Sequence, residues 1–240
     1  MKVVSLVPSI TEALLDLGVP ATAIVGRTKF CVHPENLVHN IEKIGGTKTV
    51  NIQKIKDLKP DLVIANKEEN VKEQIEEIRQ FTKVMLTDIS TIEDNYYLLK
   101  RLGNLFNCPE RAQLFNLKIY DVFQEAKVPS KVKVAYLIWR DPYMTIGRDT
   151  FIHHVLEELG FENVFRNQKR YPIVEISDLK DADVVFLSSE PFPFKDQHQE
   201  EIEFLLKNKK VIKVDGEAFS WYGTHLAKCG NYFKNLVSEF

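Results

Sequence analysis

Short apolar runs alternate with segments of helical periodicity along most of the chain. Residues 62–65 and 134–138 are continuous apolar runs of strand length, and residues 3–7 are apolar except for Ser5. Residues 52–59 and 71–81 instead carry apolar positions at helical spacing. Pro60 should end the first of these helical segments. Apolar runs that alternate with helical patterns indicate βα units and therefore parallel sheets.

The second half of the chain repeats the order of the first. The stretch VEISDLKDADVVFLSSE matches IQKIKDLKPDLVIANKE in pattern, and EEIEFLLKNKKVIKVDG matches EQIEEIRQFTKVMLTD. This repetition predicts a tandem α/β protein, although any two α/β domains share the same order of elements. We therefore expect an α/β fold of two Rossmann-like lobes, each with its own parallel sheet.

A purely helical stretch separates the two halves. Residues 91–127 contain no strand pattern, and Pro109 stands where a second helix begins. The apolar positions predicted to form one face of that helix are Leu114, Leu117, Ile119, Val122 and Phe123. We predict an N-terminal lobe over 1–90, a helical bridge over 91–128 and a C-terminal lobe over 129–240. One long helix should hold the lobes in a nearly fixed relation.

The first helix has recognisable signals at both ends. Ser9, followed three residues later by Glu12, has the spacing of a capping box. Gly18 fits the C-terminal cap. These signals predict that the helix begins at Ser9.

Composition and charge exclude several classes of function. The chain is 44% hydrophobic and 28% charged, with a net charge of −2. It therefore lacks the basic excess of a nucleic-acid or anionic-membrane binder. No apolar run has the roughly 18–20 residues of a membrane-spanning helix. Cys31, Cys108 and Cys229 are widely spaced and odd in number, which does not predict a disulfide framework.

The first residues are typical of a strand rather than of a signal peptide. They include one lysine and a short apolar run that Pro8 interrupts, without the longer apolar core and small-residue cleavage site of an export signal. No lipoprotein-type cysteine lies nearby. As written, the chain is predicted to be cytoplasmic, and it would be periplasmic or on the cell surface if a leader had been removed.

Large aromatic and polar residues follow the predicted strands. Parallel sheets bind ligands at the carboxyl ends of their strands, so two lobes with these ends facing each other would enclose a cleft. The candidate ligand-binding residues are Pro8, Phe30, His33, Glu69, Trp139, Arg140, Tyr143, Tyr171, Glu190, Trp221 and Tyr222. Aromatic rings in such a place bind flat, large ligands, although any one of them can instead pack on its own lobe. We expect Trp221 to lie on the C-terminal lobe with Trp139.

The polar candidates favour binding over catalysis. Cys31 and His33 could ligate a soft metal, although a buried cysteine and a helix-capping histidine are commoner. Glu190 could hydrogen-bond a ligand, and Arg140 could hold an anionic group or pair with Asp141. The sequence contains no nucleophile elbow, P-loop, dinucleotide-binding glycine motif or HExxH. We therefore predict no catalytic residues and no built-in metal site.

Three segments together carry a family resemblance. VVSLVPSITEALLDLG, GGTKTVNIQKIKDLKPDLVIAN and GRDTFIHHVLEELGFENVF resemble the helical-backbone substrate-binding proteins of metal-complex ABC transporters, over nearly the whole chain from Val3 to about Tyr222. The resemblance implies the class III periplasmic-binding-protein fold, with a ligand in the cleft between two lobes. It implies a monomeric binding protein that is not an enzyme and has no built-in cofactor. The ligand would be a cobalamin-like corrinoid, haem or a ferric siderophore, and the partner an ABC permease.

Single positions both match the family and depart from it. Pro8 coincides with a proline of the cobalamin-binding members, and Phe30, Tyr143 and Tyr171 fall at or near their pocket aromatics. The departures are Thr47 and Asn66 in place of pocket tryptophans, and Gln53 and either Glu175 or Ile176 in place of the glutamates that dock the permease. These departures leave open a cytoplasmic binding or regulatory protein on the same fold, or a chelatase-like enzyme.

Overall fold

The contacts within the chain divide it into two compact units. The computed structural model describes residues 1–207 and 209–240. The first unit consists of Met1–Ile89, Glu93–Ile119 and Trp221–Ala227, and the second unit consists of Ser90–Ile92, Tyr120–Ser220 and Lys228–Phe240. The chain therefore passes between the units several times, and each unit is described by itself.

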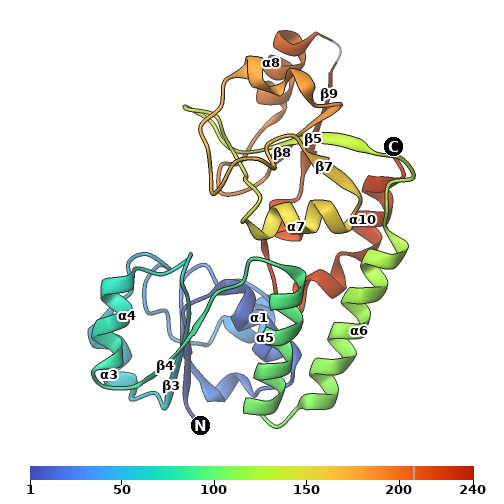
Figure 1. Ribbon diagram of the computed structural model, residues 1–240. Helices are drawn as coiled ribbons and strands as arrows, with labels where there is room; N and C mark the ends of the chain where they lie inside the picture. Colours follow the sequence, from blue (N-terminus) through green and yellow to red (C-terminus); the bar gives the residue numbers. More distant parts are fainter. Residues whose placement is uncertain (208) are drawn as a thin grey trace. The chain divides into compact units, whose positions relative to one another are not determined.

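The first unit is built on a parallel sheet. Its strands are β1 (Val3–Ser5), β2 (Ile24–Arg27), β3 (Leu62–Asn66) and β4 (Lys83–Thr87), in the order β2-β1-β3-β4. Its helices are α1 (Pro8–Asp16), the 3-10 turn η1 (Ala21–Ala23), α2 (Glu35–Val38), α3 (Ile52–Leu58), α4 (Lys72–Arg79), α5 (Ile92–Leu105) and the first part of α6 (Pro109–Glu125). Figure 1 shows α3 and α4 on one face of this sheet and α1 and α5 on the other.

Burial on both faces explains the continuous apolar strands of the first unit. Val63 and Ala65 of β3 belong to the same core cluster as Ile55 of α3 and Ile75 of α4. Since helices cover both faces of the sheet, neither face selects polar residues. The apolar runs of the sequence therefore predicted these strands correctly.

The start of α1 differs from the sequence prediction. The helix begins at Pro8, and Val7 occupies the cap position without a side-chain hydrogen bond. Proline is well suited to the first helical position, because its missing N–H would have no partner there and its φ angle is already helical. Ser9 and Glu12 therefore lie inside the helix, and the predicted capping box is wrong. Gly18, with φ of +91°, ends the helix as expected.

The second unit is also built on a mainly parallel sheet. Its strands are β5 (Val132–Trp139), β6 (Met144–Thr145), β7 (Phe161–Asn163), β8 (Val184–Ser188) and β9 (Lys210–Val214), in the order β6-β5-β8-β9 with β7 paired to β5. Only β6 is antiparallel to its neighbour within the described part of the chain. Its helices are α7 (Phe151–Glu158), η2 (Ile176–Asp181), α8 (Asp196–Leu206), α9 (Gly216–Ser220) and α10 (Gly230–Val237), and η3 (His225–Lys228) begins in the first unit. The predicted α/β class with parallel sheets is confirmed.

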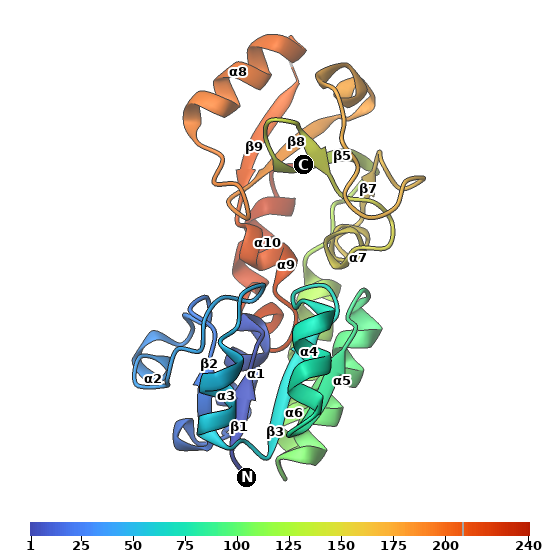
Figure 2. The same ribbon diagram turned by 90° about the vertical axis from the view of Figure 1, so that its left-hand side faces the viewer.

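Successive residues of β5 contribute to the two faces of the second sheet. Leu137 belongs to the core cluster that includes Ile202 of α8. Tyr136 points to the opposite face, where its ring lies 5.3 Å from that of Phe219 in α9. This alternation follows from the two-residue repeat of a strand. Figure 2 shows α8 separated from α7, α9 and α10 by the strands of this sheet.

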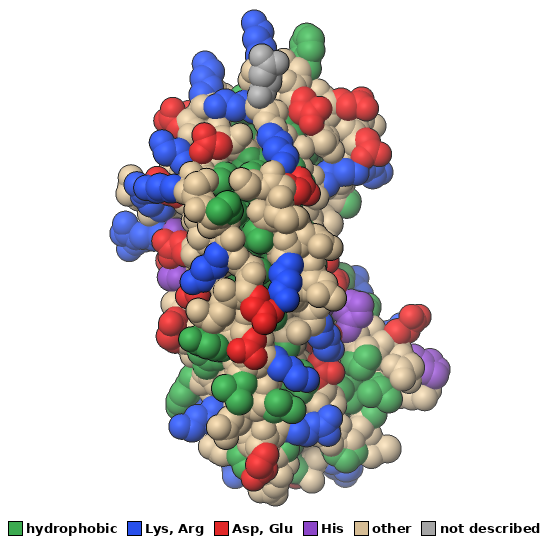
Figure 3. Space-filling model, turned by 90° about the vertical axis from the view of Figure 1, so that its right-hand side faces the viewer, with side chains coloured by type: hydrophobic (Ala, Val, Ile, Leu, Met, Phe, Trp, Pro, Cys, Tyr) green, Lys and Arg blue, Asp and Glu red, His purple; other side chains and the backbone are tan. Residues whose placement is uncertain are grey.

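Helix α6 buries only part of the predicted face, because Val122 is buried together with Ile119 and Phe123 but two leucines are not. Ala112, Ile119 and Phe123 are buried, as expected for the latter two, but the side chains of Leu114 and Leu117 are 49% and 54% exposed. Two residues correspond to roughly 200° around a helix, so Leu114 points away from Ala112, and Leu117 points away from Ile119. Figure 3, which faces α6, shows apolar side chains among the charged ones. The prediction that Leu114 and Leu117 share the buried face is wrong.

A seven-residue segment from near the C-terminus completes the first unit. This segment, Trp221–Ala227, is called the strap here, and residues of the second unit precede and follow it. The buried Asn95 accepts a hydrogen bond from the Gly223 N–H at 2.5 Å and donates one to the Gly223 carbonyl at 3.3 Å. Thr224 donates a hydrogen bond to Asp16 at 2.6 Å. These bonds explain why the strap, including Trp221, lies in the first unit. The sequence had predicted that Trp221 lies in the C-terminal lobe, and that prediction is wrong.

The described residues show neither a disulfide nor a membrane-spanning element. All three cysteines are free thiols. In the part of the chain that the structure describes, no helix combines the length and apolar character needed to cross a membrane.

Candidate ligand-binding site

The carboxyl edge of the first sheet carries several of the predicted binding residues. Pro8 follows β1 and is buried, whereas Phe30 follows β2 and is 50% exposed. The ammonium group of Lys29 lies 4.9 Å from the centre of the Phe30 ring. Phe30 is therefore a half-exposed aromatic ring with a positive charge over one of its faces.

An aromatic cluster lies next to this edge and includes a residue that the sequence did not predict. We call His33, Trp221 and His225 the ring cluster. The ring centres of His33 and His225 lie 5.3 Å and 5.4 Å from that of Trp221, and 6.3 Å from each other. His33 lies in the segment after β2, and its ring contacts two residues of the strap. The structure therefore brings the predicted residues His33 and Trp221 together.

The buried Glu12 binds one nitrogen of the ring cluster. Its Oε2 lies 2.9 Å from Nδ1 of His225, and the side chains of Glu12 and His225 are 3% and 14% exposed. A carboxylate can only accept a hydrogen bond, so Nδ1 carries the proton that it donates to Glu12. The other nitrogen, Nε2, is then the basic one when the imidazole is neutral.

Tyr222 lies beneath this edge and is not exposed on it. Its side chain is only 5% exposed. Burial, together with the nearby charge of Glu69, raises the pKa of Tyr222 well above its usual value, and hydrogen bonding with Ser9 and Thr87 opposes the shift only partly. Tyr222 is therefore neutral, and the charge that affects it belongs to Glu69, another predicted site residue.

The structure does not support a metal site made of Cys31 and His33. The Cys31 thiol is buried and lies 3.1 Å from the Thr11 hydroxyl and 3.2 Å from the Thr28 hydroxyl. Burial raises the pKa of this thiol, which disfavours the thiolate that a metal needs. Among the described residues, no three His, Cys, Asp or Glu side chains gather as a metal site.

The carboxyl edge of the second sheet begins at Trp139. This residue is 40% exposed, and its ring lies edge-on to that of Phe192 at 5.8 Å between centres. The next residue, Arg140, binds both carboxylate oxygens of Glu201 at 3.1 Å and 3.0 Å and one of Asp141 at 3.0 Å. Arg140 therefore pairs with carboxylates of its own unit, Asp141 among them. This pairing was one of the two roles predicted for Arg140, the other being to hold an anionic group of the ligand.

Other predicted residues of the second unit also have partners within it. Burial raises the pKa of Tyr143, and a hydrogen bond with Arg140 opposes that shift. The Glu190 carboxylate accepts a hydrogen bond from the Ser220 hydroxyl at 2.6 Å. The guanidinium group of Arg170 lies 5.4 Å from the centre of the Tyr171 ring.

Glu190 approaches α9 so closely that Gly216 is required there. A Cβ atom at Gly216 would lie 2.5 Å from Cγ of Glu190 and 2.6 Å from the Ser188 hydroxyl. Any larger residue would displace the loop after β8. The glycine therefore positions the Glu190 carboxylate near the end of α9.

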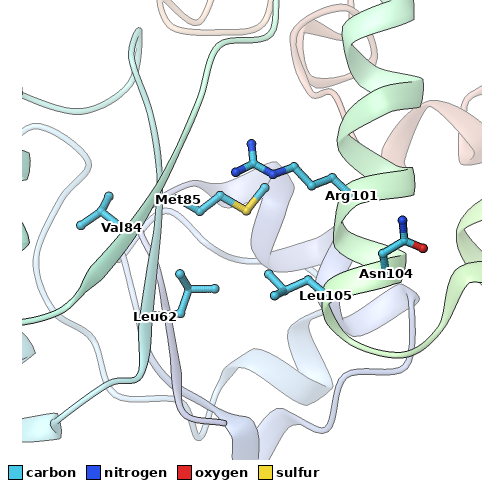
Figure 4. Close-up of a pocket in the computed structure, with 6 residues that line it drawn as sticks. All are labelled: Leu62, Val84, Met85, Arg101, Asn104 and Leu105. Atoms are coloured by element: carbon cyan, nitrogen blue, oxygen red, sulfur yellow. The ribbon is translucent and has the colours of Figure 1, made fainter.

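A hollow in the first unit lies away from the predicted site. It has a volume of about 460 Å³ and is lined by Leu62, Val84, Met85, Arg101, Asn104 and Leu105. Figure 4 shows Met85 of β4 and Arg101 of α5 approaching each other across it. Leu62 is the first residue of β3, so this hollow lies near the start of the strand and includes no predicted binding residue.

Comparison with known proteins identifies the class to which this fold belongs. Residues 3–215 match the family described as periplasmic binding protein. The chain therefore belongs to the periplasmic binding protein family, which confirms the resemblance found in the sequence.

Individual relatives narrow this class. The vitamin B12-binding protein of Salmonella paratyphi A is 28% identical over 181 residues, which cover 73% of this chain and 66% of that protein. An uncharacterized ABC transporter substrate-binding lipoprotein, YvrC of Bacillus subtilis, is 29% identical over 180 residues, covering 70% of this chain and 56% of that protein. The matched part of the chain thus spans about two thirds or less of these relatives' length.

A solved structure supports the fold over the whole chain. The periplasmic heme-binding protein HutB of Vibrio cholerae superimposes with a TM-score of 0.82 at 18% identity, covering 99% of this chain and 98% of that one. At this identity, the likeness establishes the fold alone.

Proposed function

We propose that the chain is a substrate-binding protein that captures a metal complex for uptake by an ABC transporter. The candidate ligands are a corrinoid, haem and a ferric siderophore. Support comes from the relatives named as vitamin B12-binding protein and as ABC transporter substrate-binding lipoprotein. Binding, and not catalysis, is the function of a protein of this kind.

The observation that carries the proposal is the pair of aromatic side chains that follow β2, the exposed Phe30 and His33 of the ring cluster. Flat macrocyclic complexes bind through stacking on aromatic faces and through a few polar groups that fix their orientation. The half-exposed Phe30 and the partly exposed His33 supply such faces at the carboxyl edge of the first sheet, and the buried Trp221 packs against the His33 ring. The expectation that the ligand also contacts residues of the second unit, such as Trp139, stays a prediction.

Titration with three probes tests the proposed function. The purified chain is mixed with hemin, aquocobalamin or ferrichrome, and binding is followed by calorimetry and by absorbance. We expect one of these classes to bind at one equivalent per chain with a dissociation constant in the micromolar range or below. Absence of binding by all three would overturn the proposal.

The proposed function also changes the expected location of the protein. The relatives do not support the cytoplasmic prediction. YvrC is named a lipoprotein, and the similar structure of HutB is that of a protein named periplasmic. We propose that the native protein acts outside the cytoplasmic membrane and delivers its ligand to a permease. Fractionation of the host cell tests this, and recovery of the native protein only in the cytoplasm would favour the alternative of a cytoplasmic binding protein.

A further inference from the structure

We propose that His225, oriented by Glu12, is the protein's ligand to the metal ion of the captured complex. This inference deepens the proposed function and rests on it. It narrows the ligand to a metal complex with an exchangeable axial position, such as haem or an aquocorrinoid. A siderophore complex whose iron is already fully coordinated would not use this residue.

The first argument is the hydrogen bond between Glu12 and His225. Histidines that bind metals usually donate their other N–H to a carboxylate or carbonyl, which fixes the tautomer and increases the basicity of the coordinating nitrogen. Glu12 and His225 have this arrangement, with 2.9 Å between Oε2 and Nδ1. The bond assigns Nε2 as the metal-binding nitrogen, and coordination would exchange its present surroundings for the metal.

The second argument is the burial of Glu12. Its side chain is 3% exposed, although a glutamate is almost never buried without a strong partner. Burying a carboxylate costs free energy, so fold stability alone would favour an apolar residue inside α1. A role in orienting the imidazole accounts for a carboxylate at this position.

The third argument is the position of His225 in the ring cluster. Its ring is 14% exposed, so part of it reaches the surface, and it contacts both His33 and Trp221. The rings of His33 and Trp221 are inclined by 31° and 53° to that of His225. Because a coordinated imidazole stands across the plane of a macrocycle, these two rings would meet the macrocycle mainly through their edges. Coordination and aromatic edge contacts would thus act on the same ligand.

Spectroscopy of defined variants tests the inference. Hemin and aquocobalamin change their visible spectra when an imidazole binds the metal. We expect the wild-type chain to show this change with at least one of them and His225→Ala to lose it. Glu12→Ala should weaken binding by roughly 10–100-fold, whereas Glu12→Gln, which keeps a hydrogen-bond acceptor, should weaken it less.

Two histidine variants provide matched controls. His33→Ala removes a ring of the same cluster, and His154→Ala removes an imidazole of α7 in the second unit. His33→Ala should lower the affinity but keep the axial spectrum of the bound complex, whereas His154→Ala should change neither the affinity nor the spectrum. Added imidazole should restore that spectrum to His225→Ala. If His225→Ala does not fold, the difference between Glu12→Ala and Glu12→Gln decides the question, and equal affinities would overturn the inference.

The outcomes separate this inference from the proposed function. Binding of hemin or aquocobalamin with an axial spectrum that His225→Ala leaves unchanged would overturn the role of His225 and leave the proposed function standing. Binding of ferrichrome alone would do the same. Failure of all three probes to bind the wild-type chain would overturn both.

Discussion

Trp139 is a residue at which the two possible roles of an aromatic side chain, stacking on the ligand and packing on its own unit, can be distinguished by experiment. Its ring is 40% exposed and contacts Phe192 through an edge. If it stacks on the ligand, Trp139→Ala should weaken binding at least roughly tenfold, since an aromatic pair adds about 0.5–1.5 kcal/mol beyond the area that it buries. Calorimetric titration measures this loss.

A conservative variant serves as the control for Trp139. Trp139→Phe keeps an aromatic face and should retain most of the affinity. A lower melting temperature for Trp139→Ala with unchanged affinity would show that the ring only supports the second unit.

Residues at strand ends could be found from the sequence, but their partners could not. Phe30, His33 and Trp139 follow apolar strands, and this position singled them out. The partner of Glu12, however, is His225, which lies 213 positions away along the chain. No local pattern relates these two residues, and the spacing from Ser9 to Glu12 pointed to a cap at Ser9, whereas the helix begins at Pro8 with Val7 in the cap position.

At the scale of single elements, α3 offers a measurable helix cap. The side chain of Asn51 accepts a hydrogen bond from the N–H of Lys54 at 2.9 Å. Asn51→Ala should lower the free energy of unfolding by about 0.5–2 kcal/mol, because that N–H loses its partner within the protein. Urea denaturation measures the change. Gln53→Ala, in the same helix, should cost much less, and an equal loss in both variants would contradict the capping role.

Helix α7 should make the stability of the second unit depend on pH. Burial lowers the pKa of His153, although the neighbouring Glu157 partly opposes the shift. The unfolded chain therefore binds a proton at a higher pH than the folded chain does, so stability should fall as the pH decreases from about 6.5, the usual pKa of histidine.

Thermal unfolding at a series of pH values from about 5 to about 7.5, a range that includes the usual histidine pKa of about 6.5, measures this dependence of stability on pH. His153→Gln should unfold with a weaker dependence on pH over this range. His154→Gln is the control for the adjacent position. A dependence that is identical in the wild type and in His153→Gln would rule out His153 as its source.

The elements themselves were more predictable than the faces that they bury. Apolar runs located most of the strands, because a strand covered on both faces has no polar alternation to disguise it. In α6, by contrast, apolar residues occur both on the buried face and at Leu114 and Leu117. Which set faces the core depends on the packing of the helix, and the spacing alone did not distinguish them. The short antiparallel β6 follows a turn and has too few residues for a periodic signal.

For the molecule as a whole, Asn95 is the residue that holds the strap in the first unit. It is fully buried, and its amide group exchanges hydrogen bonds with both backbone polar groups of Gly223. Asn95→Ala leaves a buried backbone N–H and carbonyl without this partner, at a cost of about 1–3 kcal/mol each. We expect a clear loss of stability in urea denaturation and faster proteolysis within the strap. Asn104→Ala, at an exposed position of α5, should change neither.

The tandem architecture followed from the repeated order of elements, but the route of the chain did not. The sequence predicts contiguous lobes because neighbouring elements usually pack together. The strap departs from this rule through bonds to Asp16 and Asn95, which are distant in sequence. Only the folded chain shows that residues from both of its ends contribute to the first unit.

The strap also determines when the first unit can be completed during synthesis on the ribosome. Domains of many proteins fold one after another as they emerge, beginning with the N-terminal domain. Here the first unit requires Trp221–Ala227, and the second requires Lys228–Phe240. A nascent chain that has reached Ser220 therefore contains two parallel sheets and no finished unit. Translation that stops shortly before the end should yield a chain with exposed core surfaces, which the proteases of the cell can degrade.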